Sequence, residues 1–229
     1  MESFSFDVAT HGATTALVYR ASEPKHATLM LAHGAGAPHT HPFMVDMAGR
    51  IASRGVDVVT FNFLYTERGR KMPDRSDVLE ACWHAAIGSV RARGGLPTER
   101  LFLGGKSMGG RMASNLAVSP IGEGLTVGGL VFLGYPLHPV NKPKVRRDGH
   151  LPRVPFPMLF VQGSRDELGS GPELRALVRR LPHASLHLVA GGDHSLALPR
   201  REGPEKQEKA LAGAADAIAA FVLTRRAVL

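Results

Sequence analysis

From residue 27 onward, short apolar runs alternate with segments in which apolar residues recur at helical spacing. This alternation is typical of βα units that build a mostly parallel central sheet with helices on both faces. Two earlier segments, 3–8 and 15–20, alternate more weakly and predict an antiparallel hairpin at the edge of the sheet. The pattern therefore predicts the α/β fold class. The predicted parallel strands cover residues 28–32, 56–61, 100–104, 128–134, 157–162 and 185–190.

The chain has 229 residues, which is within the range of one α/β domain. No break in composition divides it, so we expect one domain over residues 1–229. Cys82 lies on an apolar helix face and is predicted to be a core residue. The segment between Tyr135 and Phe156 lacks periodicity and is too short for a large lid. Apolar faces predict helices over residues 43–51, 78–90, 174–181 and 211–222.

The charge and the cysteine content of the chain indicate which binding partners and which cellular compartment to expect. The chain has 28 Lys and Arg against 20 Asp and Glu, a net charge of +8, which raises the hypothesis of a nucleic-acid partner. Because the basic residues are scattered, we do not expect nucleic-acid binding. The single cysteine can form no internal disulfide, and neither a secretory signal nor a membrane-length apolar run is recognisable. We therefore expect a cytoplasmic protein that does not associate with membranes.

The most specific motif is the G-x-S-x-G pattern of residues 105–109, centred on Ser107. It directly follows an apolar strand and opens a helical run, as a nucleophile on a sharp strand-to-helix turn requires. Glycines at 105 and 109 fit this interpretation, because larger side chains would collide across so tight a turn. A phosphate-binding loop is the alternative interpretation. That motif requires a glycine at position 100, where this chain has Arg100.

A serine nucleophile needs a base, and the base needs an acid to orient it. Asp166 follows the strand at 157–162, and His194 follows the strand at 185–190. Serine, acid and histidine thus occur in an order known for hydrolytic triads, each after a predicted strand. Taken singly, Asp166 could be a turn-capping residue and His194 an ordinary loop histidine. We consider Asp193 a weaker candidate acid, because its place next to His194 does not direct its carboxylate at the imidazole.

Acyl transfer also needs hydrogen-bond donors for the oxyanion that develops on the carbonyl. The glycine-rich segment 33–38 follows the strand at 28–32, where such a loop is expected. We predict that the backbone N–H groups of Ala35 and Met108 form this oxyanion hole. An ordinary βα turn is the alternative interpretation of the segment. His33 is expected to support the loop through a hydrogen bond.

These motifs together resemble the α/β-hydrolase superfamily, and within it the dienelactone-hydrolase-like group. That group includes the testis-expressed and chromatin-complex-subunit hydrolase-like domains. The resemblance covers nearly the whole chain and implies an α/β-hydrolase fold, and the chain length leaves little room for a large lid. Dienelactone hydrolases use a cysteine nucleophile where this chain has Ser107, so their substrate does not carry over. The matching segments are residues 33–37, 104–111, 134–139, 162–166 and 192–194.

The expected function is that of a serine hydrolase acting on an ester-like bond, a carboxylester or a thioester, of a small acyl substrate, and a peptide bond is left open as an alternative. No metal or organic cofactor is expected. The expected catalytic residues are Ser107, Asp166 and His194. The alternative is a non-catalytic α/β-hydrolase scaffold that binds a protein partner, as some domains of the group resemble interaction scaffolds.

Three further residues are candidates for substrate contact. The resemblance places His138 near the pocket, where it either contacts substrate or packs in its loop. Arg68 and Arg70, in a loop after a predicted strand, either bind an anionic group or are simply solvated.

Overall fold

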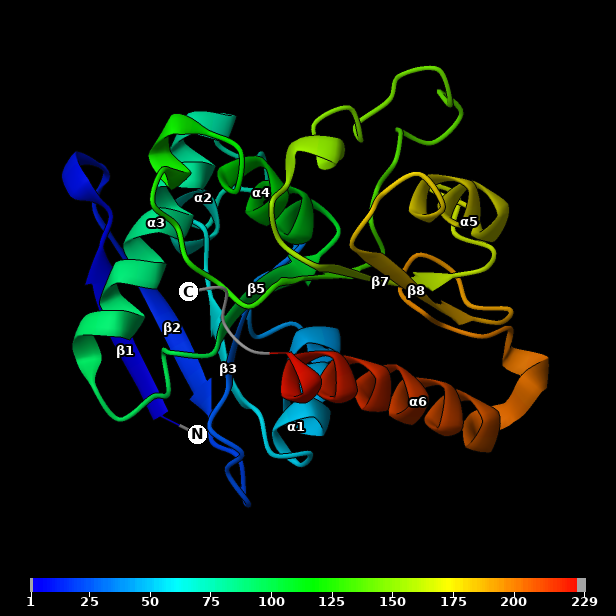
Figure 1. Ribbon diagram of the computed structural model, residues 1–229, viewed down its shortest axis with the longest axis horizontal. Coiled ribbons are helices and arrows are strands. Elements are labelled where there is room, and N and C mark those ends of the chain that lie inside the picture. Colours follow the sequence, from blue (N-terminus) through cyan, green and yellow to red (C-terminus); the bar gives the residue numbers. More distant parts are fainter. Residues whose placement is uncertain (1, 226–229) are drawn as a thin grey trace.

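Eight strands form one sheet in the computed structural model, which describes residues 2–225 (Figure 1). The strands are β1 (Glu2–Asp7), β2 (Ala13–Tyr19), β3 (Thr28–Ala32), β4 (Asp57–Phe61), β5 (Leu101–Lys106), β6 (Leu130–Leu133), β7 (Met158–Gly163) and β8 (Ala184–Val189). Their order across the sheet is β1-β2-β4-β3-β5-β6-β7-β8. β1 pairs with β2, and β2 with β4, in antiparallel fashion, and all other pairs are parallel. The predicted edge hairpin and mostly parallel sheet are confirmed.

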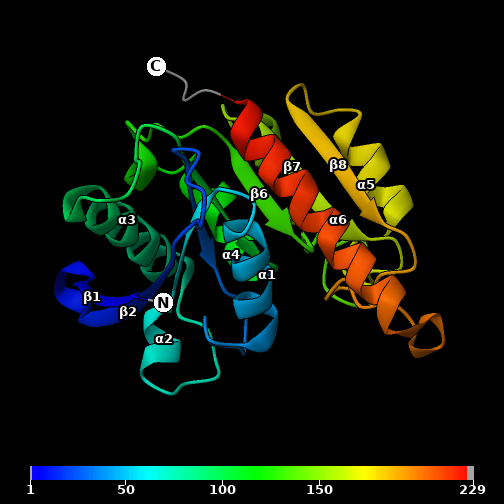
Figure 2. The ribbon, with the colours of Figure 1, turned by 90° about the horizontal axis from the view of Figure 1, so that it is seen from below.

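Helices cover both faces of this sheet. They are α1 (Pro42–Ala52), α2 (Leu64–Glu67), α3 (Ser76–Arg93), α4 (Met108–Leu116), α5 (Gly171–Val178) and α6 (Gly203–Thr224). Figures 1 and 2 show α1 and α6 on one face and α3, α4 and α5 on the other. The apolar core is divided in the same way, because residues of α1 and α6 belong to one buried cluster and those of α3, α4 and α5 to the other.

The central strands supply both halves of the core. Successive side chains of a strand point to opposite faces, so a strand covered on both sides must be apolar throughout. In β3, Met30 and Ala32 join the cluster under α3 and α4, whereas Leu29 and Leu31 join the cluster under α1 and α6. All four are fully buried. This is why the strands appear in the sequence as continuous apolar runs.

The segment between Tyr135 and Phe156 contains only one short 3-10 turn, Leu151–Arg153. Of its apolar side chains, Leu137, Leu151 and Val154 are buried in the core cluster under α3 to α5, whereas Val140 and Val145 are exposed. The prediction of a small excursion without a large lid is confirmed, and Cys82 is buried as expected. The four-residue helix α2 was not predicted. Within residues 2–225, no helix is both long enough and apolar enough to cross a membrane.

Candidate active site

Ser107 lies in the sharp turn between the end of β5 and the start of α4. Its φ of 51° and ψ of −113° are strained for a residue other than glycine. Two glycines permit the turn, because a Cβ at Gly105 or Gly109 would collide with the carbonyl oxygen of Ala32. The N–H of Ser107 donates to the carbonyl oxygen of Leu133 at 2.9 Å. The neighbouring strands thus hold Ser107 at the carboxyl edge of the sheet.

The loops after β7 and β8 bring Asp166 and His194 together. His194 Nδ1 lies 2.7 Å from Asp166 Oδ2. The carboxylate of Asp166 is almost completely buried, and its Oδ1 accepts a hydrogen bond from the N–H of Leu168 at 2.8 Å. A buried carboxylate at Nδ1 favours the tautomer that carries its proton there, which leaves Nε2 free to accept one.

Gln162, at the end of β7, holds the Asp166 carboxylate in place. Its Nε2 donates to Asp166 Oδ2 at 2.7 Å and to the carbonyl oxygen of Gly169 at 2.9 Å, while its Oε1 accepts from the N–H of Tyr135 at 2.7 Å. Sequence reasoning assigned no site role to this residue. The available signal was a polar side chain at the end of an otherwise apolar strand, four residues before the candidate acid.

Asp193, the weaker candidate acid, caps its own turn. Its Oδ1 accepts hydrogen bonds from the N–H groups of Ser195 at 2.7 Å and Ala197 at 2.9 Å. Such a turn is typical of an aspartate in a tight loop. The carboxylate that lies against the imidazole is therefore that of Asp166.

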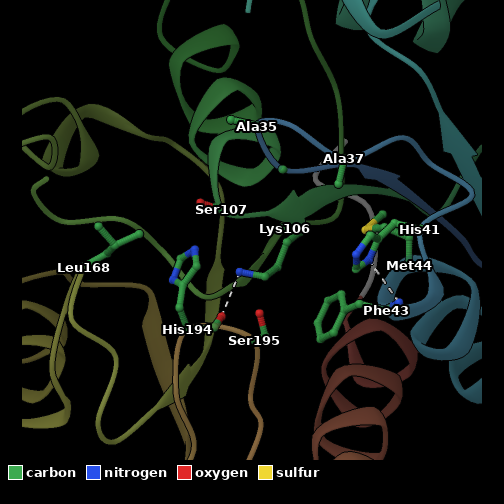
Figure 3. Close-up of a pocket in the computed structure, with 11 residues that line it drawn as sticks. Ala35, Ala37, His41, Phe43, Met44, Lys106, Ser107, Leu168, His194 and Ser195 are labelled. Carbon is green, nitrogen blue, oxygen red and sulfur yellow. Dashed lines mark hydrogen bonds between the residues drawn. The ribbon is translucent and has the colours of Figure 1, made fainter. Parts of the chain in front are cut away.

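Ser107 and His194 both line one cavity of about 390 Å³ (Figure 3). Its remaining wall is mostly apolar and is formed by Gly34, Ala35, Ala37, His41, Phe43, Met44, Lys106, Leu168 and Ser195. Within residues 2–225, no hydrogen bond joins the Ser107 hydroxyl to the His194 imidazole. Such contacts are often loose before a substrate binds. The cavity offers a hydroxyl and an oriented imidazole to the same bound molecule.

The loop after β3 contributes Ala35 to this cavity, and Met108 is the first residue of α4. Neither backbone N–H has a hydrogen-bond acceptor in the part of the chain that the structure describes. The N–H of Met108 also lies at the positive end of the α4 dipole. Two free N–H groups near Ser107 can stabilise a negative charge that develops on an oxygen.

His33 anchors that loop. Its Nδ1 lies 2.7 Å from the carbonyl oxygen of Gly34, and its Nε2 accepts from the N–H of Phe63 at 3.0 Å. A nitrogen that accepts carries no proton, so the ring is neutral and Nδ1 donates. Burial lowers the pKa of His33 to about 4, which keeps it neutral. His33 therefore supports the loop, as expected.

Comparison with known proteins shows the family of this chain. Residues 25–223 match the family model of the alpha/beta hydrolase domain. The chain belongs to the alpha/beta hydrolase family. Membership of that family supports a hydrolase function, and the similarity to individual solved structures concerns the fold.

Several solved hydrolases share this fold at low sequence identity. A dienelactone hydrolase from Anabaena variabilis is 16% identical with a TM-score of 0.73, and the match covers 98% of this chain and 97% of that one. An alpha-beta serine hydrolase homologue from Coxiella burnetii is 18% identical with a TM-score of 0.70, over 92% and 95% of the two chains. An α/β serine hydrolase without lid from Xanthomonas campestris is 18% identical with a TM-score of 0.69, over 95% and 94%.

Lys106 lies within the motif at residues 105–109, but sequence reasoning gave it no role. Its side chain is buried, and its Nζ donates to the carbonyl oxygen of His194 at 2.8 Å. Burial lowers the pKa of Lys106 to about 8, although the carboxylates of Asp166 and Asp193 act in the opposite direction. A basic residue directly before the candidate nucleophile was the available signal.

The three candidates for substrate contact are not among the residues that line the cavity of the hydrolase. His138 is buried in its loop, with Nδ1 2.9 Å from the carbonyl oxygen of Pro139 and Nε2 3.1 Å from Glu173 Oε1. These contacts fit the loop-packing alternative for His138, and a contact with substrate stays a prediction.

The two arginines lie in the loop after α2 and bind the protein itself. Arg68 donates to the carbonyl oxygen of His11, and Arg70 forms an ion pair with Asp74 at 2.5 Å. For both arginines, a contact with an anionic substrate stays a prediction. Within residues 2–225, no cluster of three or more His, Cys, Asp or Glu side chains is placed to hold a metal ion.

Proposed function

We propose that this hydrolase cleaves an ester-like bond, a carboxylester or a thioester, through an acyl-enzyme formed on Ser107. One observation carries the proposal: an imidazole held by a buried carboxylate at 2.7 Å opens onto the same cavity as a serine on a strained turn. In this proposal Ser107, His194 and Asp166 form the catalytic triad.

In the first half of the reaction, the Ser107 hydroxyl oxygen attacks the carbonyl carbon while its proton passes to His194 Nε2. Asp166 holds the imidazole in the required tautomer and stabilises the imidazolium. The carbonyl oxygen becomes an oxyanion, which accepts hydrogen bonds from the N–H groups of Ala35 and Met108. The C–O or C–S bond then breaks, and His194 returns the proton to the leaving alcohol or thiol.

In the second half, His194 takes a proton from a water molecule, whose oxygen attacks the acyl carbon of the Ser107 ester. As that intermediate collapses, the bond between the acyl carbon and the Ser107 oxygen breaks, His194 returns its proton to that oxygen, and the carboxylic acid leaves. A cavity of about 390 Å³ with a mostly apolar wall favours a small acyl group.

Labelling with a fluorophosphonate probe tests the nucleophile. We expect labelling of the unmodified protein and none of Ser107→Ala. Ser195→Ala is the matched control, because Ser195 lines the same cavity without a place in the proposed triad. Equal labelling of Ser107→Ala and the unmodified protein would refute the proposal. Absence of all labelling in a folded protein would favour the non-catalytic scaffold.

The bond type is tested with paired oxygen and sulfur esters of the same short acyl group. Faster release of the alcohol or of the thiol shows which bond the protein prefers. Release of both at similar rates would indicate that deacylation, which is common to both substrates, limits turnover.

A further inference from the structure

The cavity beside Ser107 is asymmetric in charge. Among the residues of the 2–225 range that line it, Lys106 is the only Lys or Arg, and none is Asp or Glu. Figure 3 shows the Lys106 ammonium between His194 and Phe43. Its Nζ lies 5.8 Å from the centroid of the Phe43 ring. A molecule that enters this cavity therefore meets one cation on an otherwise mostly apolar wall.

The hydrogen-bonding capacity of this ammonium is not used up. It offers three N–H donors, and in the part of the chain described here only the His194 carbonyl oxygen accepts one of them. The residue is 9% exposed, so access to solvent is limited. A buried ammonium with two free donors is costly unless another group accepts from it, and an anion does so best.

A second hollow indicates which part of a substrate reaches Lys106. It measures about 550 Å³ and shares Leu168, His194 and Ser195 with the first, but Val140, Arg165 and Glu167 form its other wall. The leaving group must be next to His194, which protonates it, whereas the carbonyl oxygen must point at Ala35. The hollow that contains Ala35, Ser107 and Lys106 thus suits the acyl portion, and the second hollow suits the leaving group.

We propose that Lys106 forms a binding subsite for a carboxylate at the far end of the acyl portion, so that the preferred substrates are monoesters of short dicarboxylic acids. This inference rests on the proposed function for the orientation of the substrate. The subsite itself can be tested by binding alone, without hydrolysis.

The first experiment measures binding by calorimetry to the Ser107→Ala protein, which cannot form an acyl-enzyme. The ligands are monomethyl glutarate and its neutral amide, methyl glutaramate, which have the same length. We expect the carboxylate to bind about tenfold to hundredfold more tightly, the range that a charge-assisted hydrogen bond supplies. Equal binding of the two ligands would overturn the proposal.

The second experiment adds Lys106→Met to Ser107→Ala, which removes the charge and keeps an unbranched side chain. The preference for the carboxylate should disappear. Lys142→Met is the control, since it removes the same charge from an exposed residue of the excursion. If Lys106→Met weakens both ligands equally, Lys106 only supports the His194 loop and the proposal is wrong. The proposal is also wrong if Lys142→Met removes the preference for the carboxylate as fully as Lys106→Met does.

The pH dependence gives a further readout. Lys106 faces Asp166 from the loop after β7, Asp193 and His194 from the loop after β8, and Phe43 from α1. Because its pKa is lowered to about 8, the ammonium loses its charge above that pH while the ligand stays ionised. The binding preference should therefore fall severalfold between pH 7 and pH 9.5, and a constant preference would contradict the subsite.

Turnover separates the two proposals. If the protein hydrolyses neutral esters through Ser107 but shows no preference for monomethyl glutarate, the subsite is wrong and the proposed function stands. If Ser107→Ala binds the carboxylate selectively but Ser107 is never labelled, the proposed function fails and the subsite stands.

Discussion

Replacing Asp166 by asparagine should nearly abolish turnover. Asp166 Oδ2 accepts from both His194 Nδ1 and Gln162 Nε2 at 2.7 Å, and Oδ1 accepts from the N–H of Leu168. The amide NH₂ of asparagine must therefore face a donor in either orientation. If it faces His194, it favours the tautomer with the proton on Nε2, which cannot accept the proton of Ser107.

The expected size of the effect follows from that loss. A wrong tautomer of the catalytic histidine lowers kcat by roughly 10³ to 10⁴, equivalent to about 4 to 5 kcal/mol of transition-state free energy. Asp193→Asn should lower kcat by less than about tenfold, because its side-chain oxygen can still accept from the N–H groups of Ser195 and Ala197.

The assay is p-nitrophenyl acetate hydrolysis by both variants, with circular dichroism and thermal unfolding as checks that each is folded. Similar losses in the two variants would refute the assignment of Asp166 as the orienting acid. A folded Asp166→Asn protein with kcat within tenfold of the unmodified protein would do the same.

Three further predictions concern stability. Gly105→Ala should cost at least about 3 kcal/mol of unfolding free energy, because its Cβ would collide with the Ala32 carbonyl oxygen. Gly88→Ala, in the exposed middle of α3 with open space around it, should gain roughly 1 kcal/mol, and urea titration would show whether the two effects have opposite signs. Burial lowers the pKa of His33 from 6.5 to about 4, so only the unfolded chain binds a proton between those values and stability is lost as the pH falls from 6.5 toward 4. The loss of unfolding free energy attributable to His33 is up to about 3 kcal/mol. His33→Asn should remove this part of the pH dependence. If the unfolding free energy of His33→Asn changes between pH 7 and pH 4.5 with the same slope as that of the unmodified protein, the burial of the ring is contradicted.

The fold could be predicted largely from the sequence because its signals are local. A strand buried on both faces must be apolar at successive positions, as β3 is, and an amphipathic helix must repeat its apolar residues every three or four positions. The turn at Ser107 is also local, since the glycines two residues to either side are what its backbone requires. The helix α2 escaped prediction because four residues are too few to show a period.

The candidate site was only partly predictable, because its polar contacts join loops that lie far apart in the chain. Lys106 and His194 are 88 residues apart, and their contact depends on the neighbouring positions of β5, β6, β7 and β8 in the sheet. The sequence alone could order serine, acid and histidine and indicate the ends of three strands. Only the tertiary structure decided that Asp166 lies against the imidazole, that His138 faces Glu173, and that an ammonium lies in the cavity. Side-chain direction at a loop is set by packing between elements, which no local pattern of residues records.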